Sequence, residues 1–317
     1  MFSRTLFVTC FLCAALVILS ACKTNDTTQD TKTKVPSIGT IVVEPIVPTT
    51  TAIENSHLTI TPSLPKDDAY LLLVDLLRNN KGCDLPCWWG ITPSISSSSD
   101  AYTTLVTFKS IAYDGLLYPT GGVIDITYPK DELLTKINVK FHSDSSGLIT
   151  RMLKISTQVL RDLGNRSYEE IYDSSSYIEL LNSYSLANIL AKYGRPSQVL
   201  LRADIYNYTQ SRETFEVTLL YPEKGIYVRY NSVAERVASN IIGCPSMAFV
   251  ELWLLSPDDK DSYDEFLSVN DATWEGNFPY TKPVEEAALM TVEEFYQTFR
   301  EPTNNCLKTS LDIWLEQ

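Results

Sequence analysis

Two cysteines and two adjacent tryptophans fall within ten residues, 82–91, and this stretch constrains the fold more than any other part of the sequence. Glycines at both ends of it can adopt positive φ angles, and three residues separate Cys83 from Cys87. A redox dithiol usually has two intervening residues and a helix N-terminus that lowers the pKa of the first thiol. Here the predicted helix ends before Cys83. The spacing therefore favours a structural disulfide over a redox or metal site.

The N-terminal segment has the pattern of an export signal. Arg4 supplies a positive charge, and residues 6–19 form an apolar run that is short for a membrane span. We expect residues 1–21 to be a signal peptide, whose removal also removes Cys10 and Cys13.

The signal ends in Leu19-Ser20-Ala21-Cys22, which resembles the lipobox of bacterial lipoproteins. The resemblance implies cleavage before Cys22, transfer of a diacylglycerol to its thiol and acylation of its amine, with palmitate a typical chain. Each buried CH₂ contributes about 0.8 kcal/mol, so two or three acyl chains hold a protein on a membrane. We therefore expect a protein of the bacterial cell envelope, extracytoplasmic and anchored to a membrane by its N-terminal lipid.

After these losses the mature chain keeps Cys83, Cys87, Cys244 and Cys306. An even number of cysteines in an exported protein predicts two disulfides. Sequential pairing is favoured, and cross-pairing between the two sets stays open. Chain entropy makes a long Cys244–Cys306 loop worth roughly 4 kcal/mol and a short Cys83–Cys87 loop about 2 kcal/mol.

Residues 22–66 are rich in Thr and Pro and predict a disordered tether. Residues 67–317 predict one globular domain of the α+β class, with helices packed on antiparallel sheet. Two similar helix–β-hairpin modules are expected at about 67–165 and 175–257. Thr291 and Glu294 form a capping-box pattern, so a C-terminal helical extension is expected over 284–317.

Several motifs together resemble a family of bacterial lipoproteins of the Chloroflexi type. They are the Cys-Asp-Leu-Pro-Cys-Trp-Trp-Gly-Ile stretch from Cys83, Tyr193-Gly194-Arg195-Pro196-Ser197, Gly243-Cys244-Pro245 and the ending from Cys306 to Trp314. This resemblance covers roughly residues 70–317 and implies no activity. The duplicated helix–Gly-x-Pro–strand order is also similar to the fold of β-lactamase inhibitory protein and of small outer-membrane assembly lipoproteins. That second resemblance implies binding of other proteins.

Composition and motifs argue against several functions. The formal charge of −13 disfavours nucleic acid. The sequence contains no nucleophile elbow, phosphate loop or zinc-protease motif. Its two histidines, His57 and His142, lack a setting for a metal or a catalytic triad, so we expect no catalytic residue, metal or cofactor. The leading hypothesis is a non-enzymatic module that binds an envelope protein or glycan, or serves as a scaffold. The alternatives are a glycan hydrolase that uses two of the many acidic residues and a purely structural surface lipoprotein.

Four aromatic residues are candidates for a contact surface: Trp88, Trp89, Trp274 and Tyr280. Adjacent residues of an extended segment face opposite ways, so at most one of Trp88 and Trp89 is expected on the surface, and burial of both as anchors is favoured. Trp274 and Tyr280 lie in an acidic stretch whose run at 258–265 predicts a solvated face rather than a calcium loop.

Overall fold

Antiparallel strands dominate the computed structural model of the chain. The structure describes residues 63–118, 121–130, 133–164, 167–171, 179–205, 213–245, 249–257, 281–302 and 305–315. All of these belong to the second of two units, His57–Gln317. The predicted signal peptide and the predicted tether up to residue 62 lie outside the described residues.

The helical elements are short. They are α1 (Lys66–Asn79), η1 (Asn80–Gly82), α2 (Ser98–Val106), η2 (Asn182–Tyr184), α4 (Leu186–Tyr193), η3 (Pro222–Lys224), α6 (Val284–Ala287), α7 (Val292–Phe299) and α8 (Asp312–Leu315).

The strands account for more of the described chain. They are β1 (Ala112–Tyr118), β2 (Gly121–Lys130), β3 (Leu133–Ser143), β4 (Ile149–Gly164), β5 (Ser167–Glu170), β6 (Gln198–Asp204), β7 (Thr214–Tyr221), β8 (Ile226–Val237), β9 (Asn240–Gly243), β10 (Phe249–Leu254), β11 (Lys282–Pro283) and β12 (Leu307–Ser310).

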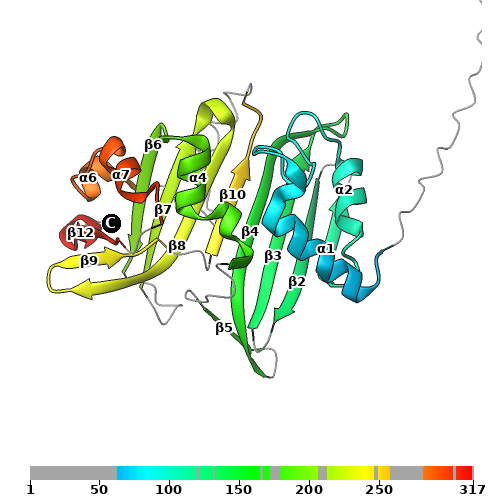
Figure 1. Cartoon of the computed structure of the whole chain (residues 1–317), viewed down its shortest axis with the longest axis horizontal. Coiled ribbons are helices and arrows are strands. Elements are labelled where there is room, and N and C mark those ends of the chain that lie inside the picture. The colour runs from blue at the N-terminus through cyan, green and yellow to red at the C-terminus, as the bar shows by residue number, and fades with distance from the viewer. Residues whose placement is uncertain are drawn as a thin grey trace, which may run out of the picture. The chain divides into compact units, whose positions relative to one another are not determined.

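One sheet runs through the described part of the chain in the order β1-β2-β3-β4-β10-β8-β7-β6-β11. Strands β1 to β4 form one meander and β6 to β8 another. Strand β10 lies between them and pairs antiparallel with β4 on one edge and with β8 on the other (Figure 1). The near-continuous apolar sequence around β10 is what a central strand with two covered faces requires.

The prediction of an α+β fold with two helix–hairpin modules is wrong. The structure is a β-rich fold in which both predicted modules contribute strands to a single sheet. The predicted repeat was one of local pattern, and local pattern does not reveal that β10 pairs with both halves. The stretch that leads to Leu163 and Gly164 is the continuation of β4.

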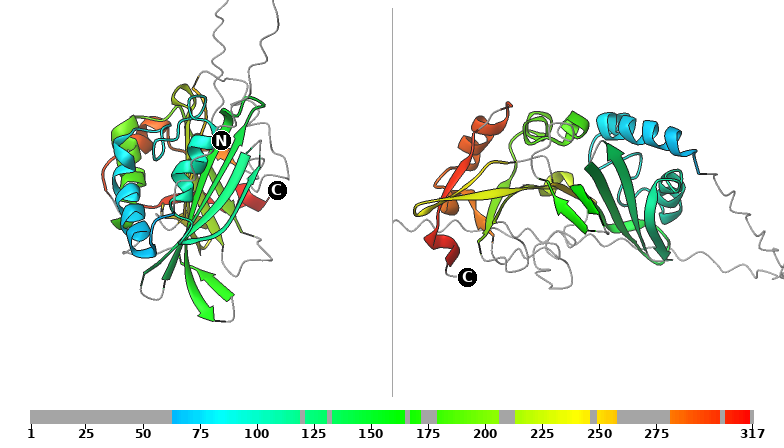
Figure 2. Two further views of the ribbon diagram at one scale, coloured as in Figure 1. Left: turned by 90° about the vertical axis from the view of Figure 1, so that its right-hand side faces the viewer. Right: turned by 90° about the horizontal axis from the view of Figure 1, so that it is seen from below.

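One face of the sheet carries the main core. Helices α1, α2 and α4 lie along this face (Figure 2). Their buried side chains, such as Leu73 and Leu190, belong to the same apolar cluster as Val139 and Ile155 of the sheet. The cluster extends over both halves, so the two meanders share one core.

The C-terminal segment is only partly helical. The capping box at Thr291 and Glu294 is present and opens α7, as predicted. Residues Leu307–Ser310, which lie within the predicted helical extension, instead form β12, which pairs with β9. The short α8 follows, and its buried Trp314 donates from Nε1 to the hydroxyl of Thr309 at 2.9 Å.

Candidate functional site

The Cys83–Cys87 stretch forms a small closed loop, which we call the knot (residues 80–91). Cys83 and Cys87 are joined by a disulfide. Buried Asn80 sits inside the loop: its amide donates to the carbonyl oxygens of Cys83 (2.7 Å) and Cys87 (2.9 Å), and its side-chain oxygen accepts from the backbone N–H of Trp89 (3.0 Å). One side chain thus satisfies three backbone groups that the tight loop would otherwise leave unpaired.

Trp88 and Trp89 do not form a contact surface, because both side chains are fully buried. The segment is not extended: Trp88 and Ile91 exchange two backbone hydrogen bonds of 2.8 Å around a turn in which Trp89 and Gly90 both have positive φ. A turn with two positive φ values is of the type I′ class. The two indole rings consequently stack on each other, with centroids 3.8 Å apart, instead of facing opposite ways.

The knot also contacts the C-terminal half of the domain. The backbone N–H of Leu85 donates to the hydroxyl of Tyr193 at 2.9 Å, and Asp84 forms an ion pair with Lys192 of the same helix, α4. Trp89 Nε1 and the Tyr184 hydroxyl are buried near each other, but neither has a partner in hydrogen-bonding geometry among the described residues. Burial raises the pKa of Tyr184 well above its ordinary value. The knot is therefore a packing element that links the end of α1 to α4.

The second disulfide joins Cys244 to Cys306 across 62 residues. Cys244 follows β9 directly, and Cys306 comes directly before β12. The bond therefore fastens the β9–β12 pair at one end. Both predicted pairings are confirmed, and the alternative cross-pairing is excluded.

The remaining predicted site residues, Cys22, Trp274 and Tyr280, lie outside the described residues, as does most of the acidic stretch after Pro257.

The most organised polar group of the described chain lies on the sheet face opposite α1, α2 and α4. Here a row of registered residues crosses six neighbouring strands, and each member is the direct partner of the next. From β2 to β7 the row consists of Asp125, Asn138, Ser156, Glu251, Arg229 and Thr218.

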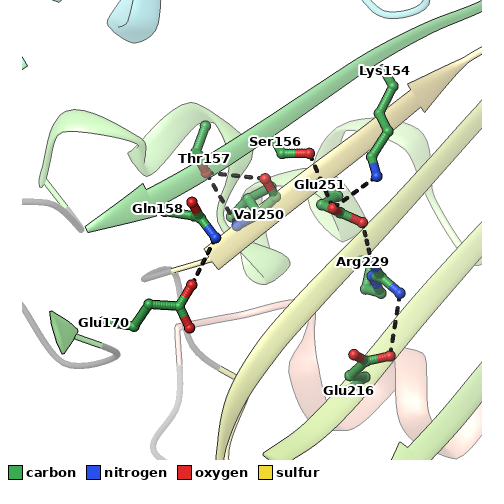
Figure 3. Close-up of polar contacts among 9 residues, drawn as sticks. All are labelled: Lys154, Ser156, Thr157, Gln158, Glu170, Glu216, Arg229, Val250 and Glu251. Carbon is green, nitrogen blue, oxygen red and sulfur yellow. Dashed lines mark hydrogen bonds and ion pairs between the residues drawn. The ribbon is translucent and has the colours of Figure 1, made fainter. Parts of the chain in front are cut away.

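Glu251 is the centre of this row and is only 3% exposed. Its carboxylate accepts from Ser156 Oγ at 3.0 Å, lies 3.2 Å from Lys154 Nζ and forms an ion pair with Arg229 Nη2 (Figure 3). Lys154 and Ser156 belong to β4, whereas Arg229 belongs to β8. Glu251 thus joins charged groups from the two halves of the sheet. We call Lys154, Glu251, Arg229 and Glu216 the charge ladder.

The ladder continues toward the edge of the C-terminal half. Arg229 Nη1 lies 3.4 Å from Glu216 Oε2, and Arg202 Nη1 lies 3.8 Å from the same oxygen. Trp253 supplies an aromatic surface, with Lys154 Nζ 5.4 Å and Arg229 Cζ 4.9 Å from its ring. Cations over an aromatic face gain a further attraction when they are removed from water.

The electrostatics of Glu251 limit its chemistry. Burial acts to raise the pKa of this carboxyl, but the charges of Arg229 and Lys154 and the hydrogen bonds from Lys154 and Ser156 outweigh it and lower the pKa below its ordinary value of 4.5. A glycosidase acid needs a raised pKa so that it carries its proton near neutral pH. Glu251 is ionised there, so this carboxylate does not have the properties that the glycan-hydrolase alternative requires of its acid.

The sequence analysis does not predict the charge ladder, because it treats the strands that contain Glu251 and Arg229 as apolar. A signal was present: Glu251 is the one charged residue of β10, and Arg229 stands among Tyr227, Val228 and Tyr230. A charge inside a strand covered on both faces requires a partner of opposite charge. The sequence does not identify that partner.

Other features of the described residues are modest. Leu77, Trp88, Ile155, Tyr184 and Leu252 help to line a small apolar cavity with room for no more than about one water molecule. Among the described residues there is no cluster of three potential His, Cys, Asp or Glu metal ligands. No described helix is long and apolar enough to cross a membrane.

Comparisons of this chain with protein-family models, curated proteins and solved structures found no match.

Proposed function

We propose that this chain is a lipid-anchored protein of the bacterial cell envelope whose domain is a non-enzymatic binding or scaffold module for another envelope protein or a glycan. The single observation that carries the proposal is the pairing of all four cysteines that follow Cys22. Disulfides form and persist in oxidising compartments outside the cytoplasm. This pairing agrees with the export signal and the lipobox-like Leu19-Ser20-Ala21-Cys22.

The construction of the domain supports a binding role. Two disulfides, a shared core and a charge ladder hold the sheet in one arrangement, and a rigid surface loses little conformational entropy on binding. Glu251, the most buried carboxylate of the ladder, is engaged by two cations and is not set up for proton transfer. These features favour recognition over catalysis.

The anchor is tested by growing cells that express the chain with an alkyne-tagged palmitate analogue. We expect label in the wild-type protein and in Cys13→Ser, which alters a cysteine of the signal but leaves the lipobox intact. Cys22→Ser should carry no label and should partition into the aqueous phase, rather than the detergent phase, of Triton X-114. Equal labelling of Cys22→Ser would contradict the anchor.

The binding role is tested by site-specific photo-crosslinking in intact cells. Leu71, Ile95 and Leu289 are large apolar side chains that are 71%, 75% and 89% exposed, so a photoreactive residue at each position samples the surface without disturbing the core. Asn79, an exposed polar position, is the control. A module with a dedicated partner yields one discrete adduct from some of these positions. Absence of adducts at every position, in cells where the anchor is confirmed, would argue for the structural alternative.

A further inference from the structure

The strand pair β4–β10, called the junction below, has a special position in the sheet. Strands β1–β5 connect to the meander β6–β8 through β10, and among the described strands β4–β10 is the only pairing that joins β10 to β1–β5. It extends from Val250 to Leu254 on one strand and from Thr157 to Leu153 on the other. Anything that loosens these five-residue segments uncouples the backbones of the two halves.

A side chain adds to the backbone pairing at one end of the junction. Buried Thr157 donates from Oγ1 to the carbonyl oxygen of Val250 at 3.0 Å, and the Val250 N–H donates to the same hydroxyl at 3.1 Å (Figure 3). These two hydrogen bonds add a side-chain contact across the junction to its backbone pairing.

Glu251 provides the charged contact that crosses the junction. Its partners are Lys154 and Ser156 on β4 and Arg229 on β8. When Glu251 is neutral, Lys154 and Arg229 remain as two buried cations over the same Trp253 ring. Removal of one member of a buried charge group strands its partners in a poorly solvated site.

The surrounding charges do not replace Glu251. Glu216 faces the other side of Arg229 and is shared with Arg202, and both lie within the C-terminal half. On the N-terminal half, Asp125 pairs with Lys136 at 3.2 Å. Neither carboxylate has a contact to Lys154 among the ion pairs of the described residues.

We propose that the junction is an acid-sensitive device, in which protonation of Glu251 by solvent breaks the charged link between Lys154 and Arg229 and loosens the β4–β10 pair before either meander. The helix-face contacts of the knot with α4 and the shared core keep the halves attached. The loosening is therefore a local opening that precedes global unfolding.

The direction of the pH dependence follows from the charge state. The folded pKa of Glu251 is lowered, so its contribution to stability is complete above the unfolded value of about 4.5 and is lost as the pH falls through the folded value. The opening is thus expected below pH 4.5, and the junction is closed at neutral pH.

The test is hydrogen–deuterium exchange of the whole exported chain, followed by mass spectrometry, with rates corrected for the intrinsic effect of pH. On acidification of the wild-type protein, peptides from the junction should lose protection before peptides from β2–β3 and β7–β8. The Glu251→Gln variant should exchange at the junction at least about 100-fold faster at pH 7. Glu216→Gln is the matched control, because Glu216 also contacts Arg229 but does not contact β4. It should leave the junction protected.

Two further variants keep the proposal open to refutation if Glu251→Gln does not fold. The double variant Glu251→Gln with Lys154→Met removes one stranded cation and should recover protection at pH 7. Lys154→Met alone removes the cation of β4 while the ionised Glu251 keeps its ion pair with Arg229, so it should make exchange at the junction less dependent on pH. Uniform loss of protection across the sheet on acidification would overturn the proposal. So would equal effects of Glu251→Gln and Glu216→Gln.

Discussion

Removal of the two disulfides should destabilise the domain unequally. The sequence separation of the bonded cysteines is 62 for Cys244 and Cys306 but only 4 for Cys83 and Cys87. In the chain-entropy model the unfolded chain gains about 4 kcal/mol of freedom when the long loop is opened and about 2 kcal/mol for the short one. Cys244 and Cys306 are exposed, so their replacement leaves no buried cavity. The expected difference is therefore about 2 kcal/mol in the free energy of unfolding.

The assay is urea denaturation of the exported chain, comparing wild type with Cys244→Ser/Cys306→Ser and with Cys83→Ser/Cys87→Ser. Double variants are used because a single replacement leaves a free thiol. Thermal unfolding is the second readout: for a domain of this size 1 kcal/mol corresponds to about 2–4 °C, so the long-loop variant should melt about 8–16 °C below wild type. An equal or larger loss in the short-loop variant would refute the reasoning and would mean that the knot is stabilised by its native contacts more than by loop closure.

Three further outcomes follow from packing and charge. A Cβ on Gly243 would lie 1.9 Å from Phe215 Cγ, so Gly243→Ala should cost at least about 1–3 kcal/mol by urea denaturation; Gly115→Ala, whose nearest contact is 3.6 Å away, is the control and should cost much less. Trp89→Ala removes a fully buried ring and should cost about 3–5 kcal/mol in the same assay; a change below 1 kcal/mol would show that the knot is not part of the core. The free energy of unfolding should fall as the pH drops below 4.5, and this fall should be smaller in Glu251→Gln; identical pH profiles of the two proteins would contradict the ionised state of that carboxylate.

The sequence predicts a structural feature correctly where the residues that form it are close together in the chain. The capping box of Thr291 and Glu294 is satisfied within four residues, so it predicts the start of α7 from the sequence alone. The disulfide between Cys83 and Cys87 closes within one loop, and its spacing favoured that pairing.

Long-range pairing required the tertiary structure. The sequence predicts two separate helix–hairpin modules. The residues of β10 and its neighbours in the chain do not indicate that one edge of β10 pairs with β4 and the other with β8. Residues 307–310 lie within the C-terminal helical extension that the sequence predicts, but pairing with β9 makes them a strand. In both places contacts distant in sequence decided the structure.

The sequence by itself determined that the four cysteines after the lipobox-like segment are even in number and suit an oxidising compartment, and that the chain alternates helical and strand patterns. Only the tertiary structure decided where the cluster of two cysteines and two tryptophans sits and which charges meet. A turn with two positive φ values stacks the rings of Trp88 and Trp89 inside the core. Strand register brings Glu251 between Lys154 and Arg229. The physical reason is that side-chain direction depends on backbone dihedrals and register, and both are fixed by packing that no local stretch of sequence contains.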